Sequence, residues 1–152
     1  MQAASTVLEP VVVKPEEDRA PFPLSLGGQH ITSKVRGADT GGAFSVLHLV
    51  AEPMSGPPMH MHTQEDEWFY ILKGEMTFQV GGKRFTAGPG TSVFAPRNIP
   101  HTWQNCTDEP VEAIGLITPA KFEGFFEDRA SGRLDTPAEF GVEFMGPPLA
   151  RL

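Results

Sequence analysis

Residues 59–74 read MHMHTQEDEWFYILKG, and this run places two histidines two positions apart, ahead of an acidic residue and a β-prone segment. Side chains at positions i and i+2 of a strand point to the same face. If the start of the run is extended, His60 and His62 therefore project into one space. Glu67 follows them, and a third histidine, His101, comes further along the chain. Three imidazoles and a carboxylate can hold a divalent transition metal and leave coordination positions open.

The chain around this run is divided into short β-prone segments by glycine and proline, which number 16 and 15. Gly81-Gly82 is a strong signal for a two-residue hairpin turn. Many short strands with frequent turn signals are typical of an all-β sandwich or barrel. No internal repeat is visible, so we expect one barrel. The expected strands are residues 27–32, 42–52, 59–62, 67–72, 75–80, 83–86, 92–95, 101–105 and 111–118.

Composition limits the classes of protein to which the chain can belong. Its 152 residues, 39% of them apolar, favour one globular domain, and no run approaches the roughly 20 apolar residues of a membrane span. The net charge of −7 comes without a basic cluster, so we expect neither a nucleic-acid nor a membrane partner. Cys106 is the only cysteine, and residues 1–13 lack a signal-peptide pattern, so we predict a reducing, cytoplasmic location.

The two ends of the chain differ from its middle. We predict an N-terminal arm at residues 1–23, a barrel at 24–118, and a C-terminal helix and tail at 119–152, packed on the barrel. Thr118 is a plausible N-cap with proline at the first helical position. A cluster of apolar side chains then follows at the i, i+3, i+4 spacing of one helical face, namely Phe122, Phe125 and Phe126.

The spacing of the histidines, together with the glycines and prolines around them, resembles the two motifs of the cupin superfamily, G-x5-H-x-H-x3,4-E-x6-G and G-x5-P-x-G-x2-H-x3-N. The resemblance covers roughly residues 42–118. Two positions depart from the pattern. Met54 occupies the first glycine position, and Asn98 occupies the middle glycine of the second motif. Both departures lie in turns and leave the metal ligands intact. The matching positions are His60, His62, Glu67, Gly74, Gly90, Pro96, His101 and Asn105.

The resemblance implies a double-stranded β-helix, or jelly-roll barrel, with His60, His62, Glu67 and His101 as metal ligands. It favours Glu67 over the neighbouring acids, which we interpret as solvated loop charges. Glu67 also begins a strand in phase with apolar residues that would line the interior. The ligand set suits one divalent ion of Fe, Mn, Ni, Co or Zn and does not distinguish among them.

Among single-domain cupins, the chain looks most like the quercetin dioxygenase-like proteins. This resemblance implies a metal-dependent dioxygenase acting on a small apolar or aromatic, enolisable substrate, with Glu67 as general base. Arg97 is the best candidate for contact with an anion or with the rim of the site, although a solvated surface arginine explains it equally well. Because single-domain cupins commonly pair through edge strands, we also expect a homodimer through the N-terminal arm. The predicted pocket residues are His48, Phe69, Phe78, Phe94, Trp103, Phe122 and Phe126, although core packing explains most of these aromatic residues equally well.

Two other classes of function stay open. One is a metal-dependent isomerase, cyclase or lyase, which would need a further acid or base. His48 is the nearest candidate for that role. The other is a non-catalytic module that binds a small molecule or a metal.

Overall fold

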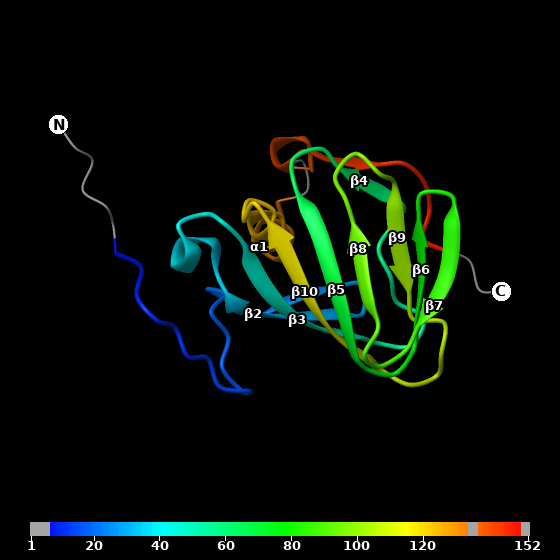
Figure 1. The fold of residues 1–152 in the computed structure, drawn as a ribbon, viewed down its shortest axis with the longest axis horizontal. Coiled ribbons are helices and arrows are strands. Elements are labelled where there is room, and N and C mark those ends of the chain that lie inside the picture. Colours follow the sequence, from blue (N-terminus) through cyan, green and yellow to red (C-terminus); the bar gives the residue numbers. More distant parts are fainter. Residues whose placement is uncertain (1–6, 134–136, 150–152) are drawn as a thin grey trace.

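Two antiparallel sheets form the protein in the computed structural model, which describes residues 7–133 and 137–149 (Figure 1). The six-stranded sheet has the order β1 (Leu24–Leu26), β2 (Gln29–Val35), β3 (Ser45–Ala51), β10 (Val111–Thr118), β5 (Asp66–Lys73) and β8 (Ser92–Ala95). The five-stranded sheet has the order β11 (Val142–Phe144), β4 (His60–His62), β9 (His101–Gln104), β6 (Met76–Val80) and β7 (Lys83–Ala87). This arrangement confirms the predicted all-β, single-domain jelly roll.

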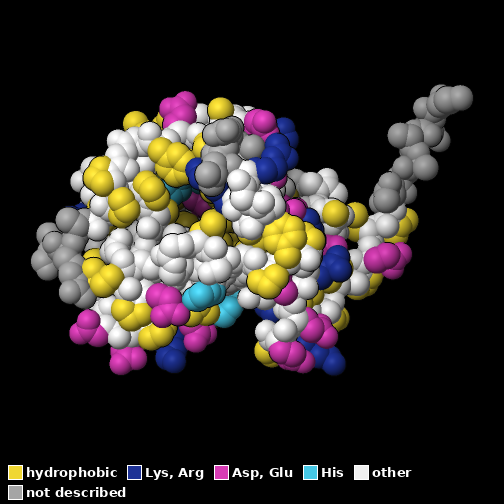
Figure 2. Space-filling model, turned by 180° about the vertical axis from the view of Figure 1, so that it is seen from behind, with side chains coloured by type: hydrophobic (Ala, Val, Ile, Leu, Met, Phe, Trp, Pro, Cys, Tyr) yellow, Lys and Arg dark blue, Asp and Glu magenta, His cyan; other side chains and the backbone are white. Residues whose placement is uncertain are grey.

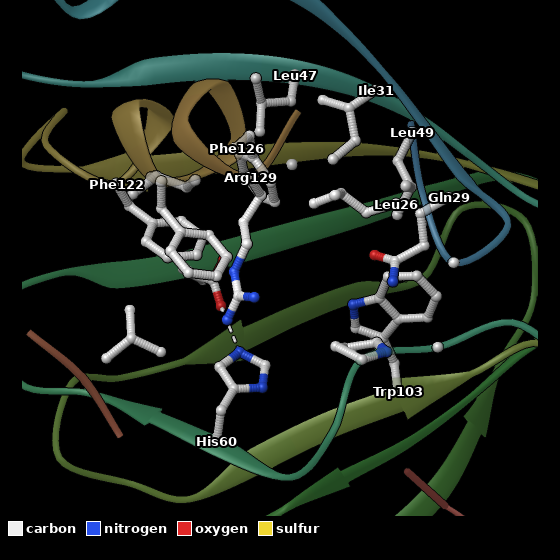
Figure 3. Close-up of a pocket in the computed structure, with 18 of the residues that line it drawn as sticks. Leu26, Gln29, Ile31, Leu47, Leu49, His60, Trp103, Phe122, Phe126 and Arg129 are labelled. Carbon is white, nitrogen blue, oxygen red and sulfur yellow. Dashed lines mark ion pairs between the residues drawn. The ribbon is translucent and has the colours of Figure 1, made fainter. Parts of the chain in front are cut away.

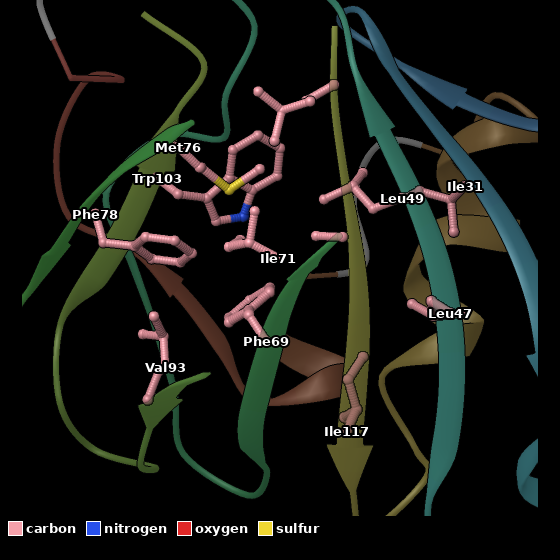
Figure 4. Packing of buried hydrophobic residues seen from close by; sticks show 14 of the residues in the cluster. Ile31, Leu47, Leu49, Phe69, Ile71, Met76, Phe78, Val93, Trp103 and Ile117 are labelled. Atoms are coloured by element: carbon pink, nitrogen blue, oxygen red, sulfur yellow. The ribbon is translucent and has the colours of Figure 1, made fainter. Parts of the chain in front are cut away.

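The hydrophobic core lies between the sheets because apolar residues alternate along the strands. In β3, Leu47 and Leu49 are buried, whereas the residues that alternate with them along the strand are half-buried. Side chains of β5, among them Ile71, point toward Met76 and Phe78 of the opposite sheet (Figure 4). Burying a side chain of this size stabilises the fold by about 1.5–3 kcal/mol. The two sheets are therefore held in a fixed relation around the interior.

The turns expected from the sequence form as predicted at the β6–β7 hairpin. Val80 pairs with Lys83 across a two-residue turn, and Gly81 has a φ of 58°. A positive φ of this kind is open to glycine at little cost. The nine expected strands all exist, with ends shifted by at most a few residues, and two short strands, β1 and β11, are added to them.

The C-terminal segment begins differently from the prediction. The helix α1 spans Glu123–Ala130, so Thr118 does not cap it. Thr118 instead ends β10, where it pairs with Asp66, and its hydroxyl donates to the carbonyl of Ala43. Tertiary pairing therefore takes precedence over the local capping signal. None of the helices in the described residues is long and apolar enough to cross a membrane.

Two further features of the tail follow α1. A short 3-10 helix spans Pro137–Phe140. β11 then adds an edge strand beside β4, with Val142 opposite His62 and Phe144 opposite His60. Sequence analysis missed β11 because its three residues are too few to show a period.

The arm ahead of the barrel has no strand in its described part, residues 7–23. In Figure 1 the beginning of this arm extends away from the barrel. Its later part is fastened to β2, because Lys34 Nζ donates to three backbone carbonyls, those of residues 14, 15 and 17. Val7 and Val12 stay exposed. Dimer formation through the arm stays a prediction. The remaining element, a 3-10 helix at Gly37–Thr40, precedes β3.

Candidate metal centre

Four side chains from three strands converge inside the barrel. His60 and His62 lie on the same face of β4, and His101 of β9 pairs directly with His60. Glu67 of β5 approaches from the other sheet. One donor atom from each of the four residues lies within 4.8 Å of the others, and all four residues are buried. The structure therefore brings together the complete predicted ligand set.

The carboxylate of Glu67 lies at the centre of the cluster. Its Oε2 atom is 2.7 Å from His101 Nε2, 3.2 Å from His62 Nε2 and 3.9 Å from His60 Nε2. All three imidazoles thus present the same ring nitrogen to one small space. This is the arrangement that a single cation requires of its ligands.

The other ring nitrogens are held by the protein backbone. His60 Nδ1–H donates to the carbonyl of Pro58 at 2.8 Å, and His101 Nδ1–H donates to that of Ile99 at 3.0 Å. These bonds hold both rings with Nε2 directed at the centre, where Nε2–H of His101 donates to the Glu67 carboxylate. His62 is buried, and neither of its ring nitrogens has a hydrogen-bond partner among the described residues. An imidazole in that condition fits a place in a metal's coordination shell.

The charges of the cluster are strongly coupled. Burial lowers the pKa of His60 to about 4, so this imidazole is neutral. Burial also acts to lower the pKa of His101, but the hydrogen bond and the charge of Glu67 outweigh it, and the pKa is raised. Burial opposes ionisation of Glu67, yet His62 and His101 hold its pKa well below the usual range. The site therefore presents an ionised carboxylate to a cation.

The acidic residues next to Glu67 differ from the prediction. Glu65 was expected to be a solvated loop charge, but it is only 1% exposed and its Oε2 lies 3.8 Å from His62 Nδ1. Burial raises the pKa of its carboxyl. Asp66 faces solvent and pairs with Arg97, whose Nη2 lies 2.9 Å from Asp66 Oδ2. Arg97 is thereby paired at the surface and does not line the cavity, as the alternative of a solvated surface arginine expects.

An apolar cavity of about 340 Å³ extends from the cluster. His60 and Glu67 form part of its wall, and β11 and α1 close one side. Figure 3 shows Phe122, Phe126 and Arg129 on one side and Trp103 and Gln29 on the other. Figure 2 shows a hollow on one face of the molecule with hydrophobic side chains around it. The lining of the cavity also includes Leu26, Ile31, Leu47, Leu49, Pro57, Pro58, Phe69, Ile117, Phe125, Val142 and Phe144.

Four of the predicted pocket residues line this cavity, namely Phe69, Trp103, Phe122 and Phe126. Three do not. Phe78 is 1% exposed and packs in the core behind Phe69, with ring centroids 5.5 Å apart. Phe94 is 60% exposed on the outer face of β8. His48 lies on the outer face of β3, where its Nε2 is 3.3 Å from Glu112 Oε2.

Sequence reasoning missed several cavity residues. Phe144 and Val142 reach the cavity only because β11 pairs with β4. Phe125 shares the predicted apolar helical face and could have been included on that basis. Arg129 lies one turn further along α1, and no local pattern distinguishes it from a solvated charge.

Comparison with known proteins agrees with this geometry. Residues 47–117 match the family model of the cupin domain. Over 88 residues, or 58% of its length, the chain is 31% identical to quercetin 2,3-dioxygenase of Bacillus subtilis (strain 168). The matched part is only 26% of that protein, so the chain spans about a quarter of this curated relative.

Solved structures share the fold at low sequence identity. KdgF from Halomonas sp. has a TM-score of 0.57 at 16% identity, covering 71% of this chain and 88% of that chain. An RmlC-like cupin from Shewanella frigidimarina has a TM-score of 0.58 at 16% identity, covering 68% and 87%. Residues 47–117 are thus similar to a cupin domain, the solved structures show a shared fold, and the buried cluster suits a metal site.

Proposed function

We propose that this metal-binding cupin is a metal-dependent dioxygenase acting on a small, enolisable substrate with an apolar or aromatic body. One observation carries the proposal. The cluster of His60, His62, Glu67 and His101 forms part of the wall of an apolar cavity. A ligand in that cavity can therefore reach the centre directly. A site that only stabilised the fold would need no such opening.

The residues present fit one divalent transition metal through three imidazole nitrogens and one carboxylate oxygen. When bound, this ion would supply a Lewis acid for a substrate oxygen and a template for the reaction with dioxygen. Glu67 lines the cavity, so its carboxylate is in a position to take the proton of a substrate hydroxyl. The backbone bonds to His60 and His101 hold the imidazoles in place during that transfer.

The walls of the cavity favour an apolar substrate and exclude water. Phe69 and Trp103 project from the two sheets, and Phe122 covers the centre from α1, with its ring centroid 4.4 Å from that of His62. Low polarity strengthens the interaction between a charged centre and a substrate oxyanion. Similarity to part of a quercetin dioxygenase agrees with this chemistry without establishing it.

The alternative of an isomerase, cyclase or lyase finds less support. It needs a further acid or base in the cavity, and His48, the residue expected to fill that role, lies on the outer face of the barrel. Cavity volume and the access to the centre also favour a catalytic site over a purely metal-storing module.

Oxygen uptake tests the proposal. The protein would be reconstituted separately with Fe(II), Mn(II), Co(II) and Ni(II), and incubated with flavonols and β-diketones. We expect substrate-dependent oxygen consumption with at least one metal, and its loss in His101→Ala. Glu112→Gln, which alters a histidine–carboxylate pair on the outer face, should keep full activity. Absence of uptake with every metal and substrate, in protein shown to hold metal, would refute the dioxygenase proposal.

A further inference from the structure

Arg129 is a cation in the wall of a cavity that is mostly apolar apart from Gln29 and the two candidate ligands His60 and Glu67. Its side chain points from α1 into the cavity, on the side opposite Trp103 and Gln29 (Figure 3). Its guanidinium carbon lies 5.2 Å from the ring centroid of Phe125 and 5.9 Å from that of Phe144. Contacts of this kind hold a guanidinium in place while leaving its N–H groups free to donate.

The acidic residues of α1 are occupied elsewhere. Glu127 pairs with Arg36 at 2.6 Å, and Asp128 lies 3.6 Å from Arg133. Glu123 accepts a hydrogen bond from a backbone N–H outside the helix. In residues 7–133 and 137–149, no ion pair joins Arg129 to a carboxylate. The cation therefore faces the cavity with aromatic rings as its described partners.

The position of Arg129 relates it to the metal centre. The ring of Phe144 adjoins the guanidinium and also lies near His60, with the two ring centroids 6.4 Å apart. Arg129 and His60 line the same cavity. A small molecule in the cavity can therefore approach the centre with one group and the guanidinium with another. A bound divalent ion would make this side of the cavity still more positive, which favours an anionic ligand.

We propose that Arg129 binds the carboxylate of the substrate, so that the cavity selects small apolar or aromatic acids over neutral analogues. This inference rests on the proposed function, because it takes the cavity as the substrate site. A guanidinium matches a carboxylate through two parallel N–H···O bonds, which a lysine ammonium cannot reproduce. The aliphatic walls formed by Ile31, Leu47 and Leu49 then receive the apolar body of the acid.

Binding of 3-phenylpropanoate and of its neutral amide, measured by calorimetry, tests the proposal. Each ligand would be titrated into metal-free and Zn(II)-loaded protein. We expect the acid to bind at least about tenfold more tightly than the amide in both forms, as a charge-assisted bidentate pair implies. Arg129→Gln should remove this preference in the metal-free protein, reduce it in the Zn(II)-loaded protein, and leave affinity for the amide unchanged in both, which also shows that the cavity is intact. Arg129→Lys should retain only part of the preference.

Arg133→Gln is the matched control, since Arg133 follows the same helix and does not line the cavity. It should bind both ligands as the wild type does. A preference for the acid that persists in metal-free Arg129→Gln, or its absence in the metal-free wild type, would overturn the inference. Arg129-dependent binding of the acid without oxygen uptake on any substrate would support the anion site and refute the dioxygenase proposal, so the two failures are distinguishable.

Discussion

Glu65 allows a substitution whose effects on stability and on metal affinity should have opposite signs. Its carboxyl is 1% exposed, and neither oxygen has a hydrogen-bond partner among the described residues. One oxygen lies 3.8 Å from Nδ1 of His62, which is beyond hydrogen-bond distance. A metal on Nε2 would make the Nδ1–H a stronger donor and draw it toward this carboxylate. Glu65 therefore costs stability without metal and supports His62 when metal is bound.

The magnitudes follow from burial and from this contact. A buried polar group without a partner costs about 1–3 kcal/mol. Glu65→Met has a similar volume and no such group, so the free energy of unfolding of the metal-free protein should rise by about that amount. Loss of an outer partner of a ligating histidine weakens metal binding by roughly 10–100-fold. Glu65→Gln keeps an acceptor oxygen and should fall between the wild type and the methionine variant in both properties.

Two measurements check the prediction. Urea unfolding of the metal-free protein gives the change in stability, and competition with a chromophoric chelator gives the affinity for Zn(II). Glu112→Gln serves as control, because its carboxylate contacts His48 on the outer face. It should change neither quantity appreciably. A methionine variant that binds Zn(II) as tightly as the wild type, or that unfolds more easily without metal, would show that Glu65 does not act through His62.

Two further predictions concern the centre and the core. Affinity for Zn(II) should fall as the pH decreases. Glu67 outweighs burial and raises the pKa of His101 above 6.5, so a proton must leave His101 before metal binds. His60, with a pKa of about 4, is already neutral. Below the pKa of His101, Kd should increase about tenfold per pH unit, and a flat profile between about pH 5.5 and 6.5 in Zn(II) titrations would contradict this assignment. Phe78→Ala should lower the free energy of unfolding by about 3–5 kcal/mol and Phe94→Ala by about 0.5 kcal/mol or less, and equal losses in urea unfolding would contradict the burial of the two rings.

Periodicity predicted the strands and the residues that share a face, but not which face is inward. In β3, His48 alternates with Leu47 and Leu49, and both sets look apolar enough to be buried. The structure turns the leucines inward and His48 outward. In β8, likewise, Phe94 was expected to face inward, but it is exposed and the smaller Val93 is buried. The packing of the two sheets against each other determines which face of each strand is buried, and the sequence of one strand alone does not reveal it.

The two departures from the cupin motifs show how the chain keeps the expected geometry with other residues. Met54 and Asn98 have φ values of 64° and 62°, and they are the non-glycine residues with positive φ in the described chain. Both therefore adopt the left-handed conformation that the motif assigns to glycine. Asn tolerates it readily, and the backbone N–H of Met54 donates to the carbonyl of Asn105 at 2.8 Å. Gly56 remains obligatory, because a Cβ there would lie 2.2 Å from the carbonyl oxygen of Trp103.

The candidate metal ligands and one side of the cavity come from different parts of the chain, and only the part with the ligands matches the cupin domain. The four candidate ligands all fall within residues 47–117, the part that matches the cupin domain. The side of the cavity formed by α1 and β11, including Phe122, Arg129 and Phe144, lies wholly outside that part. The match to the cupin domain therefore includes the candidate ligands but not this side of the cavity, where the proposed selection of the substrate would take place. The guanidinium of Arg129 in that wall is the feature that would make the cavity around the metal centre specific for a substrate with a carboxylate.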